Sequence, residues 1–213
     1  MGMNKIIAVW CALFCATCFL SVNANQVQTV DNNKRSEQSM LSEIEIYVNG
    51  LKSLMASFSE RTSRNNEKNK GHIYIKRASI NGKTVVKINY ESGELLSVSL
   101  SGRFLTITDR KKKKSRTYSI LTTPLYSILA GKLDFKNFDY TLLENTPQRV
   151  TVQFFYEKQN FKLTFRKNKN KIDKLLFWNV SSDKGWAEIT LDDKEYYEND
   201  LSKIPEEVFK KKD

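Results

Sequence analysis

Few residues of this 213-residue chain have the types and spacing that catalysis requires. Cys15 and Cys18 form a Cys-x-x-Cys pair of the kind that redox enzymes and metal sites use. His72 is the only histidine, and the sequence holds no Gly-x-Ser-x-Gly, no phosphate-binding glycine-rich loop and no His-Glu-x-x-His. We therefore expect no enzyme, no cofactor and no metal site, and we expect His72 to lie at the surface.

The cysteines all lie in an N-terminal segment that has the order of an export signal. Lys5 precedes an uncharged apolar run over residues 6–22, and Val22-Asn23-Ala24 supplies a small-x-small ending. We expect cleavage after Ala24, so that residues 1–24 are a signal peptide and the Cys-x-x-Cys pair is lost before folding. The alternative is an uncleaved anchor. The apolar run is slightly long for the apolar part of a signal peptide and only a little short of the roughly 20 residues that a spanning helix needs.

The charge of the chain favours contact with anionic surfaces. Lys and Arg number 35 against 24 Asp and Glu, a net charge of +11. The basic residues are mostly single lysines in turns, not a stripe interleaved with aromatic residues, so we do not expect nucleic-acid binding. The densest run, RKKKK at 110–114, lies between two strand-like segments. We interpret it as a solvated hairpin tip, with attraction to anionic lipid head groups as the alternative.

Two helices are predicted. Apolar residues recur at spacings of three and four from Leu41 to Phe58, which favours a helix of about 12–16 residues. Residues 25–40 are polar and lack periodicity, so we expect a flexible N-terminal segment there and a single domain over 41–213. A second, shorter helix is expected to begin at Pro124 and end near Gly131.

Between and after these helices the apolar residues alternate with a period of two. Turn signals such as Asn81-Gly82 separate the alternating segments, which is typical of an antiparallel meander. A sheet of roughly eight to eleven strands must curl, and its apolar concave face needs a cover, which the two helices supply. The predicted strands are 71–77, 84–90, 95–100, 103–108, 150–156, 161–165, 172–180 and 186–191.

The order of these elements resembles the periplasmic outer-membrane lipoprotein carrier family, LolA, over roughly residues 41–135. The sequence departs from the family at Ala78, where a Pro usually follows Arg77, at Ser101, where an Asp is usual, and after Tyr90, where a Pro is missing. The segments that carry the resemblance are Ala56-Ser57-Phe58, Gly71 to Arg77, Lys87-Ile88-Asn89-Tyr90, Ser101-Gly102, and Thr123-Pro124 followed by Leu125, Ile128 and Leu129.

The resemblance implies a mainly β fold with helices (α+β), an unclosed antiparallel β-barrel, or half-barrel, covered by a helical lid. It also implies a periplasmic carrier, a monomer, that takes acyl chains of lipoproteins from an inner-membrane ABC exporter to an outer-membrane acceptor. Exposed acyl chains cost about 0.8 kcal/mol per methylene, so three chains of roughly 15 methylenes need a large apolar surface. The alternative is a lipid-sensing regulatory half-barrel domain of envelope-stress signalling.

Arg77 is the residue with the most specific expected role. Alternation places it on the face of Ile73 and Ile75, from which its guanidinium reaches carbonyls at an end of the lid helix. The resemblance implies a reversible latch there, and the alternative is a strand-end Arg in solvent. The expected lid-helix residues are Pro124, Leu125, Ile128 and Leu129. The expected cavity lining is Phe58, Ile73, Ile75, Val86, Ile88, Tyr90, Leu96 and Val98.

Overall fold

A computed structural model describes residues 31–63, 65–77, 84–92, 96–120, 124–156, 158–183 and 185–209, without the side chains of 31–35 and 65–67. The expected signal peptide with its cleavage site, residues 25–30, Ala78, the Asn81-Gly82 turn and Thr123 lie outside the described residues. Among the described helices, none combines the length and the apolar character that crossing a bilayer requires.

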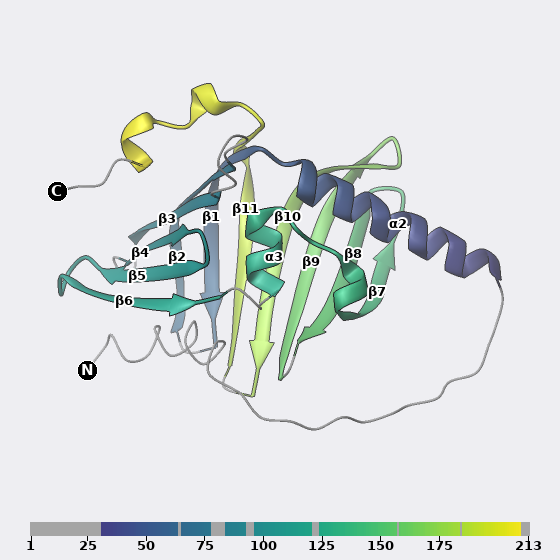
Figure 1. Ribbon diagram of the computed structural model, residues 1–213, viewed down its shortest axis with the longest axis horizontal. Coiled ribbons are helices and arrows are strands. Elements are labelled where there is room, and N and C mark those ends of the chain that lie inside the picture. Colours follow the sequence, from purple (N-terminus) through teal and green to yellow (C-terminus); the bar gives the residue numbers. More distant parts are fainter. Residues whose placement is uncertain are drawn as a thin grey trace.

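The described strands form one antiparallel sheet of eleven strands (Figure 1). Its spatial order is β6-β5-β4-β3-β2-β1-β11-β10-β9-β8-β7. The strands are β1 Ser53–Thr62, β2 Asn65–Arg77, β3 Thr84–Ser92, β4 Leu96–Ser101, β5 Phe104–Asp109, β6 Lys114–Ser119, β7 Asp139–Asn145, β8 Arg149–Tyr156, β9 Gln159–Asn168, β10 Lys171–Ser182 and β11 Gly185–Glu198.

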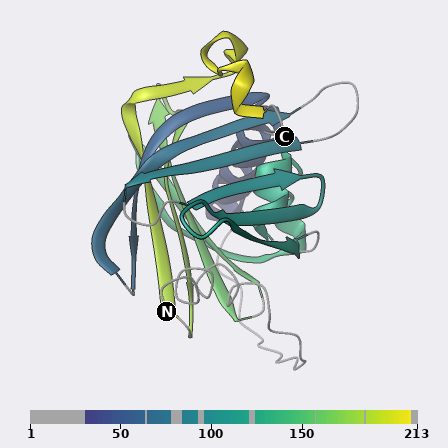
Figure 2. The same ribbon diagram turned by 90° about the vertical axis from the view of Figure 1, so that its left-hand side faces the viewer.

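The sheet is unclosed, because β6 and β7 are its two edges and do not pair with each other in the described chain. Two runs of hairpins, β1 to β6 and β7 to β11, meet where β1 pairs with β11, with Phe58 opposite Leu191. The register shifts between Ala56 and Phe58, and such bulges increase the local bend of a strand. Figure 2 shows that the sheet curls around the helices.

Two α-helices cover the concave face, α2 (Asp31–Gly50) and α3 (Pro124–Ala130) (Figures 1 and 2). The side chains of Leu41, Ile44 and Val48 on α2 are buried in the same apolar cluster as the strands. The short 3₁₀ helices are η1 Phe135–Asn137, η2 Leu201–Lys203 and η3 Glu206–Phe209. The predicted half-barrel with a helical lid is therefore confirmed.

The predicted first helix was misplaced at both ends. The helix begins at Asp31, so residues 31–40 are helical and not a flexible lead-in, and β1 begins at Ser53. A polar helix end projecting into water has no apolar stripe that reveals it. Leu54 and Phe58 have helical spacing but belong to β1, where Leu54, Ala56 and Phe58 alternate into the core. Four-residue spacing satisfies both periods, so it does not distinguish a helix from a strand here.

Candidate functional site

The concave face of the sheet carries one cluster of buried apolar side chains beneath the helices. The predicted lining residues are all buried in it, none more than 4% exposed. Cross-strand register places Ile73 opposite Ile88, and Ile88 opposite Val98, so one apolar row runs from β2 to β4. Whether this surface meets acyl chains stays a prediction. The lining residues are Phe58, Ile73, Ile75, Val86, Ile88, Tyr90, Leu96 and Val98.

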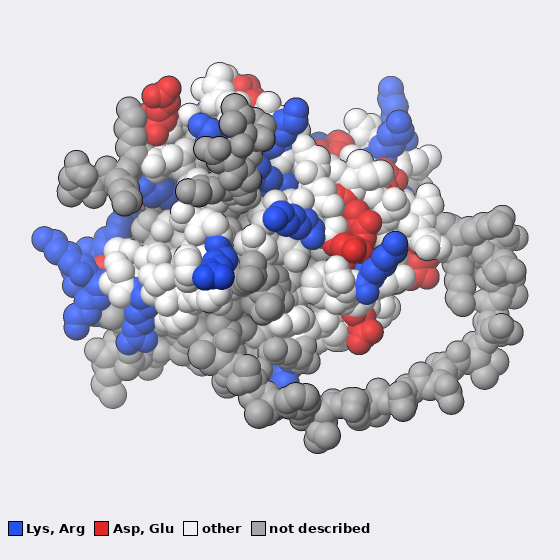
Figure 3. All heavy atoms as spheres, viewed as in Figure 1, with Lys and Arg blue, Asp and Glu red and all other residues white. Residues whose placement is uncertain are grey.

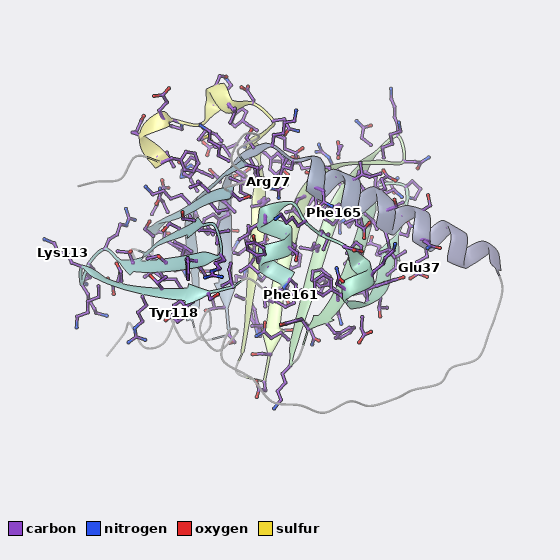
Figure 4. All side chains as sticks on the ribbon, in the orientation of Figure 1. Glu37, Arg77, Lys113, Tyr118, Phe161 and Phe165 are labelled. Atoms are coloured by element: carbon purple, nitrogen blue, oxygen red, sulfur yellow. The ribbon has the colours of Figure 1, made fainter. Side chains whose placement is uncertain are left out.

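The concave face extends well beyond the predicted lining, onto β8 to β10. Phe154 and Phe161 stack with centroids 5.5 Å apart and lie in the same cluster, together with Phe165 (Figure 4). These positions alternate as clearly as those on β2 to β4. They were missed as lining because the family resemblance weakens after residue 135, although the period-two signal itself was sufficient to find them.

A buried polar group interrupts the concave face near the end of β1. Glu60 is 0% exposed and accepts hydrogen bonds from Asn69 Nδ2 at 2.9 Å and from Tyr90 Oη at 3.0 Å. Among the described residues, the Asn69 Oδ1 and Thr62 Oγ1 atoms have no hydrogen-bond partner. Sequence reasoning missed this group, although Glu60 continues the inward alternation of Leu54, Ala56 and Phe58. A buried carboxylate is retained only where donors compensate it, as the Asn69 and Tyr90 side chains do.

Arg77 joins the ends of both helices to the end of β2. Its Nε donates to Leu129 O at 2.9 Å and its Nη2 to Ile128 O at 2.6 Å, both near the C-terminus of α3. Its Nη1 donates to Leu51 O at 2.7 Å and also to Val48 O, at the end of α2. The last carbonyls of a helix have no intrahelical donor, and the negative end of the helix dipole favours a cation there.

The geometry of Arg77 corresponds to the contacts expected from its place on β2, but it reaches two helices where one was predicted. Figure 4 shows Arg77 at the upper end of α3. Burial lowers the pKa of Arg77 to about 10, so the guanidinium remains charged at neutral pH. The contacts are thus charge-assisted hydrogen bonds from the guanidinium to neutral carbonyls. That they open and close in use stays a prediction.

Gly131 provides the space into which the Arg77 guanidinium fits. It follows α3 with φ of +68°, the left-handed conformation that ends many helices and that glycine adopts without strain. A Cβ at this position would lie 2.7 Å from Arg77 Nη1. The sequence identified Gly131 only as a helix terminator. Its second role, close approach to a side chain from a distant strand, has no local sequence signal.

The predicted lid residues all lie where α3 meets the sheet. Pro124 and Leu129 are buried, whereas Leu125 and Ile128 are half-buried and pack against the core cluster. Two hydrogen bonds hold the segment after α3 to α2. Asn49 Nδ2 donates to Leu133 O and Leu133 N donates to Asn49 Oδ1, each at 2.8 Å. The two helices therefore form one connected cover.

A polar cluster joins the last turn of α2 to β11. Tyr47 and Tyr196 both donate to Glu198, and the backbone N–H of Leu175 donates to Tyr47 Oη at 3.0 Å. Burial is the main cause that raises the pKa of Glu198, and it also raises the pKa of both tyrosines. The site therefore favours the protonated form of Glu198 more than water does.

The convex face carries a separate polar hollow of about 610 Å³. His72 lies there, on the face opposite Ile73 as alternation predicted, with its Nδ1 2.8 Å from Glu91 and its Nε2 3.3 Å from Glu195. In the described part of the chain, no group of three or more His, Cys, Asp or Glu side chains is placed to hold a metal ion. This hollow is open, polar and unconnected with the helices that cover the concave face.

No family model matches this chain, and no curated protein is similar to it. Solved structures with a similar fold include MucB in complex with MucA from Pseudomonas aeruginosa, at 12% identity and a TM-score of 0.46 over 78% of this chain. A LolA superfamily protein from Nitrosomonas europaea matches at 13% identity and a TM-score of 0.40, covering 82% of this chain and 97% of that one. The lipoprotein LppX of Mycobacterium tuberculosis matches at 11% identity and 0.41, covering 75% and 96%.

Proteins of the LolA superfamily, the family that the sequence resembles, are thus among the similar solved structures. The match spans 58% of the MucB chain, less than two thirds of its length.

Proposed function

We propose that this chain is exported to the periplasm, where it binds the acyl chains of lipoproteins released from the inner membrane and delivers them to an outer-membrane acceptor. It acts as a carrier and chaperone and not as an enzyme. An inner-membrane ABC exporter is the proposed donor. The observation that carries the proposal is an apolar concave face covered by two helices, with Arg77 of the sheet bound to the ends of both.

The construction of the cover supports release as well as shielding. The helix α3 is only seven residues long, too short to be stable by itself, so its position depends on contacts with the rest of the protein. Leu125 and Ile128 are only half-buried, so little apolar contact is lost when α3 moves away from the sheet. An acyl chain that takes the place of α3 on the sheet gains about 0.8 kcal/mol for each methylene that it buries. Burial of roughly ten methylenes therefore offsets several kcal/mol of lost contacts between α3 and the sheet.

The test is release of a triacylated lipoprotein from spheroplasts into the soluble fraction by the purified exported chain. The expected result is release that rises with added protein and saturates near one lipoprotein per chain. The variant Ile128→Asn places an amide against the apolar cluster and should release much less, whereas its neighbour control Ser127→Asn should behave as wild type. Lipoprotein that stays with the membranes at saturating wild-type protein would contradict the carrier function.

A further inference from the structure

Positive charge is concentrated at one end of the sheet. Residues 96–120 contain seven basic residues and one acidic residue, Asp109, so this segment carries +6 of the chain's net charge of +11. Figure 3 shows basic side chains gathered at the left end of the molecule, over the β5–β6 hairpin, whose tip is marked by Lys113 in Figure 4. Charge this dense repels itself, so its retention in one place requires an explanation beyond solubility.

The turn that carries the lysines is built to hold them outward. Asp109 accepts a hydrogen bond from Lys112 N at 2.8 Å and pairs with Lys112 Nζ at 3.4 Å. Arg110 donates to Tyr90 O on β3, which fixes the base of the hairpin. Lys113 adopts φ of +52°, the left-handed conformation that closes the turn. The lysines are exposed, yet their backbone is fixed by these contacts.

The register of β6 places two of these cations, Lys114 and Arg116, at the rim of the concave face. Leu105, Ile107 and Asp109 are the inward, buried positions of β5. Arg116 pairs with Ile107, and Lys114 pairs with Asp109, so both point to the concave side of the sheet. β6 is an edge of the unclosed sheet. An apolar surface therefore ends at a row of exposed cations.

We propose that the β5–β6 hairpin is a docking surface for a bilayer containing anionic phospholipid. Lys111, Lys112, Lys113 and Lys114 contact lipid phosphates, and Arg116 brings the open edge of the half-barrel to the head groups. Lysines are strongly hydrated point charges on flexible stems, which suits a fluid surface of phosphates better than one shaped partner. This inference concerns where the protein docks, and it does not require that the protein carries lipoproteins.

The experiment is co-sedimentation of the exported chain, isolated from the periplasmic fraction, with phospholipid vesicles that contain no lipoprotein. Vesicles of phosphatidylglycerol and phosphatidylcholine in equal parts are compared with phosphatidylcholine alone, at low and at raised salt. A variant with four hairpin lysines neutralised is compared with a control that loses the same net charge at exposed lysines elsewhere. The hairpin variant is Lys111→Gln, Lys112→Gln, Lys113→Gln, Lys114→Gln, and the control is Lys132→Gln, Lys136→Gln, Lys158→Gln, Lys171→Gln.

Each basic residue close to an anionic membrane strengthens binding roughly five-fold, so the hairpin variant should bind on the order of 10²–10³-fold more weakly. Wild type and control should bind the anionic vesicles alike, lose binding as salt rises and ignore phosphatidylcholine. Equal losses in both variants would overturn the hairpin site in favour of net charge alone. Absence of wild-type binding at low salt would overturn a lipid partner in favour of an acidic protein, and would leave the release of lipoproteins from spheroplasts as a separate question.

Discussion

Arg77→Leu removes the one side chain that joins β2 to the ends of both α2 and α3. Leucine keeps an apolar side chain near the helix ends but removes the hydrogen bonds from Arg77 to the carbonyls of Leu51, Ile128 and Leu129. If Arg77 acts as a latch, the loss should appear as local opening of the helical cover. If it is only one more contribution to the core, the whole sheet should become less stable instead.

The magnitude follows from the four contacts. A hydrogen bond to a charged group contributes roughly 1.5–3 kcal/mol, or at least about 6 kcal/mol for the four. Burial lowers the pKa of Arg77 to about 10, which corresponds to a cost of about 3 kcal/mol for holding the cation there. The remaining ~3 kcal/mol predicts a more than hundredfold rise in the open population.

Native-state hydrogen exchange measures this opening directly. The amides of Gly131 and Lys132, which donate to carbonyls of α3, report on the lid, and amides of the β1–β11 pair report on the sheet. Arg77→Leu should accelerate exchange at the lid amides about a hundredfold and leave the sheet amides within a few-fold. Arg61→Leu, at an exposed position of β1, is the control. Unchanged lid exchange, or equal acceleration across the sheet, would refute the latch.

Three further substitutions test the cover. Gly131→Ala, strained at φ +68° and directed at the guanidinium, should cost about 1–2 kcal/mol and loosen α3, whereas Gly50→Ala, with no atom within 4 Å, should change the urea midpoint little. Asn49→Ala should lower the free energy of unfolding by about 2 kcal/mol, because it removes two hydrogen bonds with Leu133. The loss should be visible as faster hydrogen exchange of the Leu133 amide. Burial raises the pKa of Glu198, so its carboxyl group binds a proton more readily in the folded protein than in the unfolded chain. The wild-type protein therefore loses stability as the pH rises from about 4.5 through that raised pKa. Glu198→Gln should remove this loss, so that its unfolding free energy exceeds that of wild type by a gap that widens with pH; a constant gap in urea unfolding would contradict the assignment.

The sheet was predictable where side chains alternate between water and core. β3, β4 and β9 have this pattern and lie close to the predicted ranges. The edge strand β7 was not predicted, and β6 was indicated only as the strand-like segment after the 110–114 hairpin tip, without bounds. Most side chains of both strands are exposed and leave no apolar period to detect. An edge strand is specified by the neighbour with which it pairs, which local sequence does not contain.

The same limit applies to the site. Arg77 was predictable in position, since alternation assigns it to the concave face, and its link to α3 agreed with the family resemblance. Its contacts with the end of α2 were not predictable, because they depend on where a helix ends 26 residues earlier in the chain. Three further features were not predictable for a similar reason. The contact of Gly131 with Arg77 and the hydrogen bonds of Asn49 with Leu133 join residues that are distant in sequence. The buried Glu60 has a polarity that argues against burial.

The central claim is that acyl chains lie against the concave face, and photocrosslinking tests it most directly. A benzophenone amino acid replaces Tyr118, which packs against the core cluster from β6, or its neighbour Thr117, which is exposed on the other face. Cells labelled with radioactive palmitate are then irradiated. Crosslinks to labelled lipoprotein from position 118 and not from position 117 are the predicted result; equal labelling at both positions, or none at 118, would contradict it.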